Sequence, residues 1–299
     1  MSKLSRRRLG ALAAGAIVTA LTVAPPAAAA GLPAARTAAS TIPSYPASRV
    51  LSVVARDDAL RLGRSTVSSG LVALDLRNAG TVDHEALLMK LKPGVTVQQY
   101  VDTLTNSGLG AANALLVYSG GANVVRPGKS QVTVQSLTAG QYLVLSYAQD
   151  ENAVPEVVKG MYTPLTVVDD GAPSVTLPAG LVKGMITAHD MTYTLPSTLD
   201  GHGVYQFTVT DPKVPHEVGF IRLAPGVTRD DVLDWAMTET GPKPFTAAGG
   251  FGALPTGGTG WFYLDLPPGQ YAAICFVHSP YPPYESHAAM GQIVLFTVN

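Results

Sequence analysis

The chain repeats itself along most of its length, and this self-similarity limits the fold more than any other feature of the sequence. The two copies are offset by about 130 residues. Matching segments occur in the same order in both copies: HEALLMKLKPGVT at 84–96 with HEVGFIRLAPGVT at 216–228, GQYLVLSY at 140–147 with GQYAAICF at 269–276, and GMYTPLTV at 160–167 with GQIVLFTV at 291–298. We therefore expect two copies of one fold, at residues 47–170 and 171–299.

Both copies have the pattern of β-strands. Apolar and polar residues alternate along short segments such as 71–77 and 204–209, which is typical of strands with one buried face. The chain is poor in charge, with 14% Asp, Glu, Lys and Arg, and rich in turn formers, with 30 Gly and 23 Pro. We predict an all-β protein of two tandem β-sandwiches, each independent of the other.

One short helix is expected in each copy. Thr96 and Thr228 both follow a Pro-Gly-Val segment and are typical N-cap residues. Gln99 and Asp231, three positions later, can return the hydrogen bond to the cap. The spacing predicts that a helix begins after each threonine.

The N-terminus resembles a bacterial twin-arginine export signal. Arg6 and Arg7 precede an apolar run at 11–24, and small residues at 27–31 offer a cleavage site near residue 30. The run is too short for a retained membrane anchor, and we find no other segment that could span a bilayer. We expect residues 1–30 to be an export signal, residues 31–46 to be a flexible linker, and the mature protein to be secreted or held in the cell envelope.

Charge and cysteine content narrow the function. The net charge of −1 lacks the basic excess that nucleic-acid binding requires. Cys275 is the single cysteine, so it cannot form an internal disulfide. In an oxidising compartment it could be a reactive thiol, an intermolecular bridge or a metal ligand.

Both copies resemble the cupredoxins, the blue-copper family of Greek-key β-sandwiches, in their fold, and the second copy also resembles them at the metal site. TDPKVPHE at 210–217 resembles the loop with the first histidine ligand, AICF at 273–276 the cysteine strand, and HAAMGQIV at 287–294 the segment with the second histidine and the methionine. The resemblance implies that His216, Cys275, His287 and Met290 bind one type-1 copper ion in the second copy, for electron transfer or copper handling. It leaves the redox or extracellular protein partner unknown.

The loop between the cysteine and the second histidine departs from the family pattern. Eleven residues separate Cys275 from His287, far more than in blue-copper proteins. A long loop can still bring its ends together at modest entropic cost. His278 lies closer in sequence and is the alternative ligand, but it does not align with the segment before the last strand.

The first copy lacks three of the four ligands. Ser146 aligns with the cysteine, Glu156 with the second histidine and Lys159 with the methionine, whereas His84 is retained. We therefore expect no copper in the first copy.

The alternative to copper binding is a metal-free extracellular binding or structural module. In that case Cys275 and Met290 pack as apolar side chains in the core, and His287 is a loop residue. We expect no enzymatic activity, because hydrolase and nucleotide-binding motifs are missing and the six His are too few for the copper cluster of a multicopper oxidase.

Overall fold

The computed structural model describes residues 46–299, except 151, 179, 240 and 282–284. The expected export signal at 1–30, and the expected linker apart from Pro46, lie outside the described residues. Within the described part of the chain, no helix has the length and apolar character needed to cross a membrane.

The fold is all-β, as predicted. The first half contributes β1 (Val50–Arg56), β2 (Ala59–Leu62), β3 (Thr66–Ser68), β4 (Gly70–Asn78), β5 (His84–Leu91), β6 (Leu116–Val125), β7 (Ser130–Leu137), β8 (Gly140–Leu145) and β9 (Tyr162–Val168). The second half contributes β10 (Val182–His189), β11 (Thr192–Thr194), β12 (His202–Val209), β13 (His216–Leu223), β14 (Phe245–Leu254), β15 (Thr259–Asp265), β16 (Gly269–Ile274) and β17 (Ile293–Val298).

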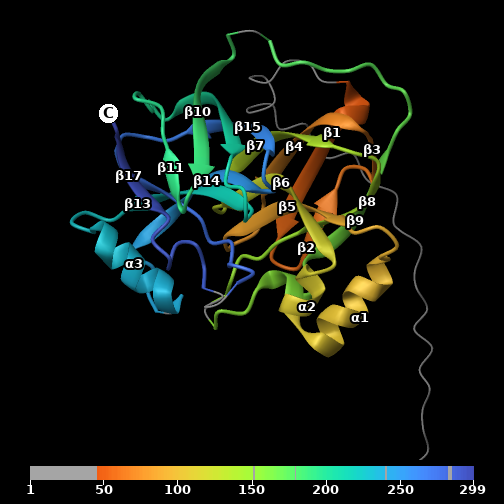
Figure 1. Cartoon of the computed structure of the whole chain (residues 1–299), viewed down its shortest axis with the longest axis horizontal. Coiled ribbons are helices and arrows are strands. Elements are labelled where there is room, and N and C mark those ends of the chain that lie inside the picture. Colours follow the sequence, from red (N-terminus) through yellow and green to blue (C-terminus); the bar gives the residue numbers. More distant parts are fainter. Residues whose placement is uncertain (1–45, 151, 179, 240, 282–284) are drawn as a thin grey trace, which may run out of the picture. The chain divides into compact units, whose positions relative to one another are not determined.

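The strands form two sheets, and each sheet contains strands of both halves (Figure 1). The eight-stranded sheet has the order β11-β10-β12-β15-β7-β4-β1-β2, and the nine-stranded sheet the order β17-β16-β13-β14-β6-β5-β8-β9-β3. Apart from β3, the second half contributes to each sheet the counterparts of the first-half strands in mirrored order.

The expectation of two independent sandwiches is therefore wrong, because both sheets continue from one half into the other. β14 pairs with β6 through Phe251 and Ala122, and β15 pairs with β7 through contacts that include Phe262 and Thr133. In the alignment of the two copies, Phe251 is the counterpart of Ala122. The halves thus meet through equivalent strands, and the boundary at residues 170–171 stays a prediction.

The two expected helices are present and begin where predicted. α1 (Val97–Ser107) and α3 (Arg229–Thr238) each start with a capping box, made by Thr96 with Gln99 and by Thr228 with Asp231. The first half has a second short helix, α2 (Leu109–Asn113), which the sequence analysis did not predict. Gly108 separates it from α1 with a φ of 83°, a backbone conformation that favours glycine.

The central strands β5 and β13 are buried on both faces. Alternate residues of β13 divide between two clusters: Val218 and Phe220 pack in the core between the sheets, whereas Ile221 and Leu223 pack against α3. His216 has the same parity as Val218 and Phe220. The strand period therefore directs its side chain toward the core between the sheets.

Candidate metal centre

Three segments of the second half carry the candidate ligands. His216 is the first residue of β13, Cys275 directly follows β16, and His287 precedes β17. β13 and β16 are antiparallel neighbours, and Gly219 pairs with Ile274, the residue before the cysteine. This pairing places His216 and Cys275 at the same end of the nine-stranded sheet.

The long loop after Cys275 folds back on itself. The backbone N–H of Ala288 donates to the carbonyl of Cys275 at 2.7 Å, and that of His287 donates to the carbonyl of Val277 at 2.9 Å. An isolated bridge between His278 and Ser286 continues this pairing. The loop therefore returns as a hairpin, and its length does not keep His287 away from the cysteine.

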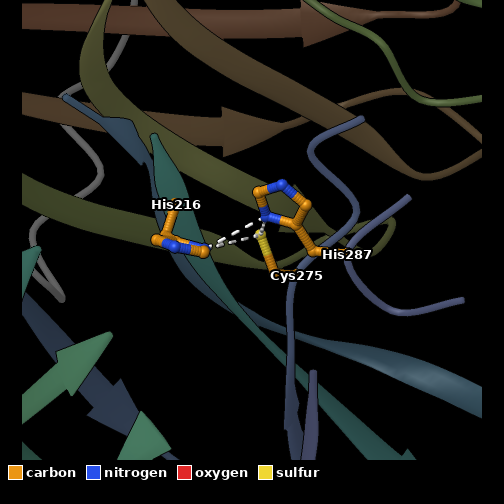
Figure 2. Close-up of side chains that lie close together, drawn as sticks. All are labelled: His216, Cys275 and His287. Atoms are coloured by element: carbon orange, nitrogen blue, oxygen red, sulfur yellow. Dashed lines mark hydrogen bonds between the residues drawn. The ribbon is translucent and has the colours of Figure 1, made fainter. Parts of the chain in front are cut away.

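The three side chains point toward one another (Figure 2). The Sγ of Cys275 lies 3.4 Å from the Nδ1 of His287 and 3.9 Å from the Nδ1 of His216, and the two Nδ1 atoms are 3.1 Å apart. Metal–ligand bonds of about 2.0–2.3 Å place neighbouring donor atoms roughly 3.3–4.0 Å apart in a tetrahedral or trigonal site. The spacing of these donor atoms therefore suits one metal ion.

Burial makes the cluster neutral in the metal-free chain. All three residues are 0% exposed. Burial raises the pKa of the Cys275 thiol and lowers the pKa of His216. Burial, with the neighbouring His216, lowers the pKa of His287 to about 4. Two neutral imidazoles and a thiol are the groups that a thiophilic metal binds, with loss of the thiol proton.

The outer nitrogens of the two imidazoles differ. The Nε2 of His216 lies 3.3 Å from a carboxylate oxygen of Asp211. Asp211 is held by hydrogen bonds from the backbone N–H groups of Lys213 and Val214. The Nε2 of His216 and the Nε2 of His287 are both buried and lack a hydrogen-bond partner among the described residues.

These unpaired buried nitrogens can be explained by metal binding. In the metal-free chain, the Nδ1 of His216 is 2.9 Å from the side-chain oxygen of Gln292 and must carry a proton to bond with it. A neutral ring then turns an unprotonated Nε2 toward the Asp211 carboxylate, which is an unfavourable contact. If Nδ1 binds a metal instead, Nε2 carries the proton and can donate to Asp211, as metal-bound histidines commonly do.

Met290 is less buried than the three residues of the cluster. Met290 is 39% exposed, whereas His216, Cys275 and His287 are fully buried. Its backbone N–H donates to the carbonyl of Ser286 at 3.0 Å, within the turn that precedes β17. The expected convergence of Met290 with the other three ligands stays a prediction.

Gln292 is the polar side chain that the sequence analysis missed. It is 0% exposed, and its Oε1 lies 2.9 Å from the Nδ1 of His216. A signal was available in the aligned segments, where the glutamine of GQIV stands opposite the buried Met161 of GMYT.

His278, the alternative ligand, lies apart from the cluster. Its side chain is 58% exposed, and its Nε2 is 4.0 Å from a carboxylate oxygen of Glu239. The cluster contains His287 instead.

The equivalent pocket of the first half holds a hydrogen-bonded network of different residues. The Nδ1 of His84 is 2.8 Å from a carboxylate oxygen of Glu156, and the hydroxyl of Ser146 donates to the same carboxylate at 2.6 Å. The Nε2 of His84 is 3.2 Å from Asp57. Burial opposes the charged imidazole, but these two carboxylates outweigh it and raise the pKa of His84.

Comparisons with known proteins find likenesses among solved structures. Auracyanin from the photosynthetic bacterium Roseiflexus castenholzii matches 41% of this chain and 99% of its own, with 19% identity and a TM-score of 0.29. A multicopper oxidase matches 84% of this chain and 89% of its own, with 15% identity and a TM-score of 0.23. A copper-containing nitrite reductase from Thermus scotoductus matches 83% and 60%, with 10% identity and a TM-score of 0.22.

No family model matches the chain. No curated protein matches it either.

The expectation that the protein is not an enzyme is corrected by these matches. The solved structures that resemble the chain include an oxidase and a reductase as well as the small auracyanin. The chain itself is all-β, with its strands in two sheets.

Proposed function

We propose that the protein binds one copper ion in its second half, through the Nδ1 atoms of His216 and His287 and the Sγ of Cys275. The observation that carries this proposal is the convergence of these three buried donor atoms within 4.8 Å of one another. Two imidazoles and a thiolate in a trigonal arrangement are the donor set of blue-copper sites. Copper held in this way supplies one-electron redox chemistry.

The residues around the cluster orient the ligands and keep water away. The hairpin from Cys275 to Ala288 fixes the cysteine and His287 relative to each other through two backbone hydrogen bonds. Asp211 faces the outer nitrogen of His216 and can fix the orientation of the ring. Complete burial of the three ligands keeps solvent away from the donor atoms.

We further propose that the protein is exported and that its two halves are copies of one fold. Export is supported by the paired Arg6 and Arg7 before an apolar, acid-free segment. The duplication is supported by the matched segments and by the mirrored strand orders of the two halves. A copper protein of this kind exchanges electrons or copper with a partner protein outside the cytoplasm.

The experiment is a titration of the purified protein, with residues 1–30 removed, with copper(II). We expect one equivalent to bind and to give an intense visible band, because donation from a thiolate to copper(II) colours such sites. Cys275→Ser should abolish the band. The control His278→Ala should keep it, since this exposed side chain lies outside the cluster.

Two results would contradict the copper site. One is a wild-type protein without the band, and the other is a band that persists in Cys275→Ser. Either result would favour the metal-free binding or structural module, with Cys275 as a residue of the core between the sheets.

A further inference from the structure

We infer that the side-chain oxygen of Gln292, and not the sulfur of Met290, is the axial ligand of this site. The inference rests on the proposed copper site and specifies its fourth contact. Gln292 is fully buried, and its Oε1 lies 2.9 Å from the Nδ1 of His216, one of the three donor atoms of the cluster. Met290 is 39% exposed.

The amide of Gln292 is oriented by a second contact. Its Nε2 donates to the backbone carbonyl of Thr192, in β11, at 3.3 Å. This hydrogen bond uses the donor side of the amide and leaves the oxygen facing the cluster. An amide oxygen is one of the known weak axial donors of blue-copper sites.

The first half has an equivalent turn, in which Met161 stands at the position of Gln292. The backbone N–H of Met161 donates to the carbonyl of Glu156 at 3.1 Å, and that of Gln292 donates to the carbonyl of His287 at 2.8 Å. A glycine with positive φ precedes each of these residues, Gly160 at 97° and Gly291 at 99°. The turn therefore has the same form in both halves.

The exposure of side chains in the two turns agrees with this assignment. Met161 is 2% exposed and Gln292 is 0% exposed. Lys159, the counterpart of Met290, has a side chain that is 45% exposed. In both halves, then, the residue after the glycine points into the pocket and the residue before it points outward.

The identity of the axial atom has a consequence for redox balance. An amide oxygen is a harder donor than a thioether, and copper(II) is harder than copper(I). Gln292 should therefore stabilise the oxidised ion and lower the reduction potential relative to a site with methionine at this position. The partner that reduces such a site must itself be a stronger reductant than one that serves a methionine-ligated site.

The test compares Gln292→Met, Gln292→Leu and the matched control Met290→Leu, each loaded with copper(II). We expect Gln292→Met and Gln292→Leu to shift the electron paramagnetic resonance spectrum and to raise the reduction potential. Met290→Leu should leave both unchanged. Gln292→Met replaces one unbranched side chain by another of similar length, and thermal melting of each metal-free variant checks that it folds.

The outcomes separate this inference from the proposed function. If the wild type shows the thiolate band but Met290→Leu changes the spectrum and the Gln292 variants do not, the axial assignment is overturned and the copper site stands. If the wild type shows no band at all, both are overturned. Shifts confined to the Gln292 variants support the assignment.

Discussion

The two pockets at equivalent ends of the two halves share a backbone but differ in the side chains that fill them. The second half places His216, Cys275 and His287 so that their donor atoms face one another, with two buried nitrogens left without hydrogen bonds. The first half places His84 against Glu156, and all of the pocket's polar groups contact one another.

The difference shows which of the two pockets pairs its polar groups without a bound metal ion. In the first half, the carboxylate of Glu156 replaces the second imidazole and pairs with the retained histidine, which also contacts Asp57. In the second half, three uncharged donors converge, and the carboxylate of Asp211 faces the outer nitrogen of His216. An arrangement of this kind is stabilised by a cation that binds all three donors.

The largest expected effect is the conversion of the first pocket into a copper site. The double variant Ser146→Cys/Glu156→His supplies the missing thiol and imidazole, and the buried Met161 stands at the position equivalent to Gln292. We expect copper bound per chain to rise from one equivalent to two, measured by metal analysis together with the visible band. Ser146→Cys alone is the control. A double variant that still binds one equivalent would show that the pockets differ in more than these side chains.

A smaller effect is expected from breaking the network of the first pocket. Glu156→Ala removes the partner of the fully buried His84 and should lower the free energy of unfolding by about 3–5 kcal/mol at pH 5. Urea denaturation measures it. Lys159→Ala removes an ion pair with Asp150 that is partly exposed, and should cost less than about 1 kcal/mol. Equal losses in the two variants would show that the buried pair does not stabilise the pocket.

The two pockets should also respond to pH in opposite directions in the metal-free protein. The pKa of His84 is raised, so its contribution to stability is present below about pH 6.5 and is lost as pH rises through the folded-state pKa. The pKa of His287 is lowered to about 4, so its neutral form favours the folded state and this contribution is lost as pH falls from 6.5 toward 4.

Two variants separate these contributions. Acidification to pH 4 should destabilise the wild type through His287 by roughly 3 kcal/mol, since one pKa unit corresponds to about 1.4 kcal/mol. His287→Gln should lose this acid sensitivity, whereas His84→Gln should lose stability relative to the wild type mainly below pH 6.5. Denaturation across pH 4–8 measures both, and parallel pH profiles for the two variants would contradict the contrast.

The smallest expected effect on stability concerns the helix N-caps, which are the same in both halves. Thr96→Ala and Thr228→Ala each remove the side-chain cap of a helix, and each should cost about 1 kcal/mol. Thr105→Ala, at an exposed position of α1, is the control. Urea denaturation measures the free energy of unfolding of each variant. A large difference between the two cap variants would show that the halves differ in their helices as well as in their pockets.

Local sequence patterns predicted the strands and the helix starts, and the resemblance to cupredoxins predicted three residues that meet in the cluster. The caps are local, because Thr96 and Gln99 are neighbours in the chain. His216 and Cys275 could be placed because each stands at a strand end that recurs in both copies. Copper binding itself stays a prediction.

Met290 was chosen for its residue type, and the turn that orients it could not be read from that type. The left-handed Gly291 reverses the chain between Met290 and Gln292, so the two side chains point to opposite sides. The shared turn Gly160–Met161 and Gly291–Gln292 was visible in the alignment, but only burial shows which residue faces the pocket.

The continuity of the sheets was missed because pairing between distant strands has no local pattern. The paired glycines of both halves are a partial signal. A Cβ at Gly120 would lie 2.9 Å from the ring of Phe251, and a Cβ at Gly252 would lie 2.7 Å from the carbonyl of Gly120. These glycines let the backbones of the two halves approach each other closely. The sequence of one copy taken alone does not reveal this approach.

The pairing of β6 with β14 and of β7 with β15 also determines what would happen to either half alone. Separated from the other half, each would carry two edge strands with unpaired backbone N–H and C=O groups, which are templates for association with other chains. Because each of these strands pairs with its own counterpart, the exposed edges are self-complementary. An isolated half should therefore form a homodimer through the same pairing, and the tandem chain is equivalent to that dimer joined into one polypeptide.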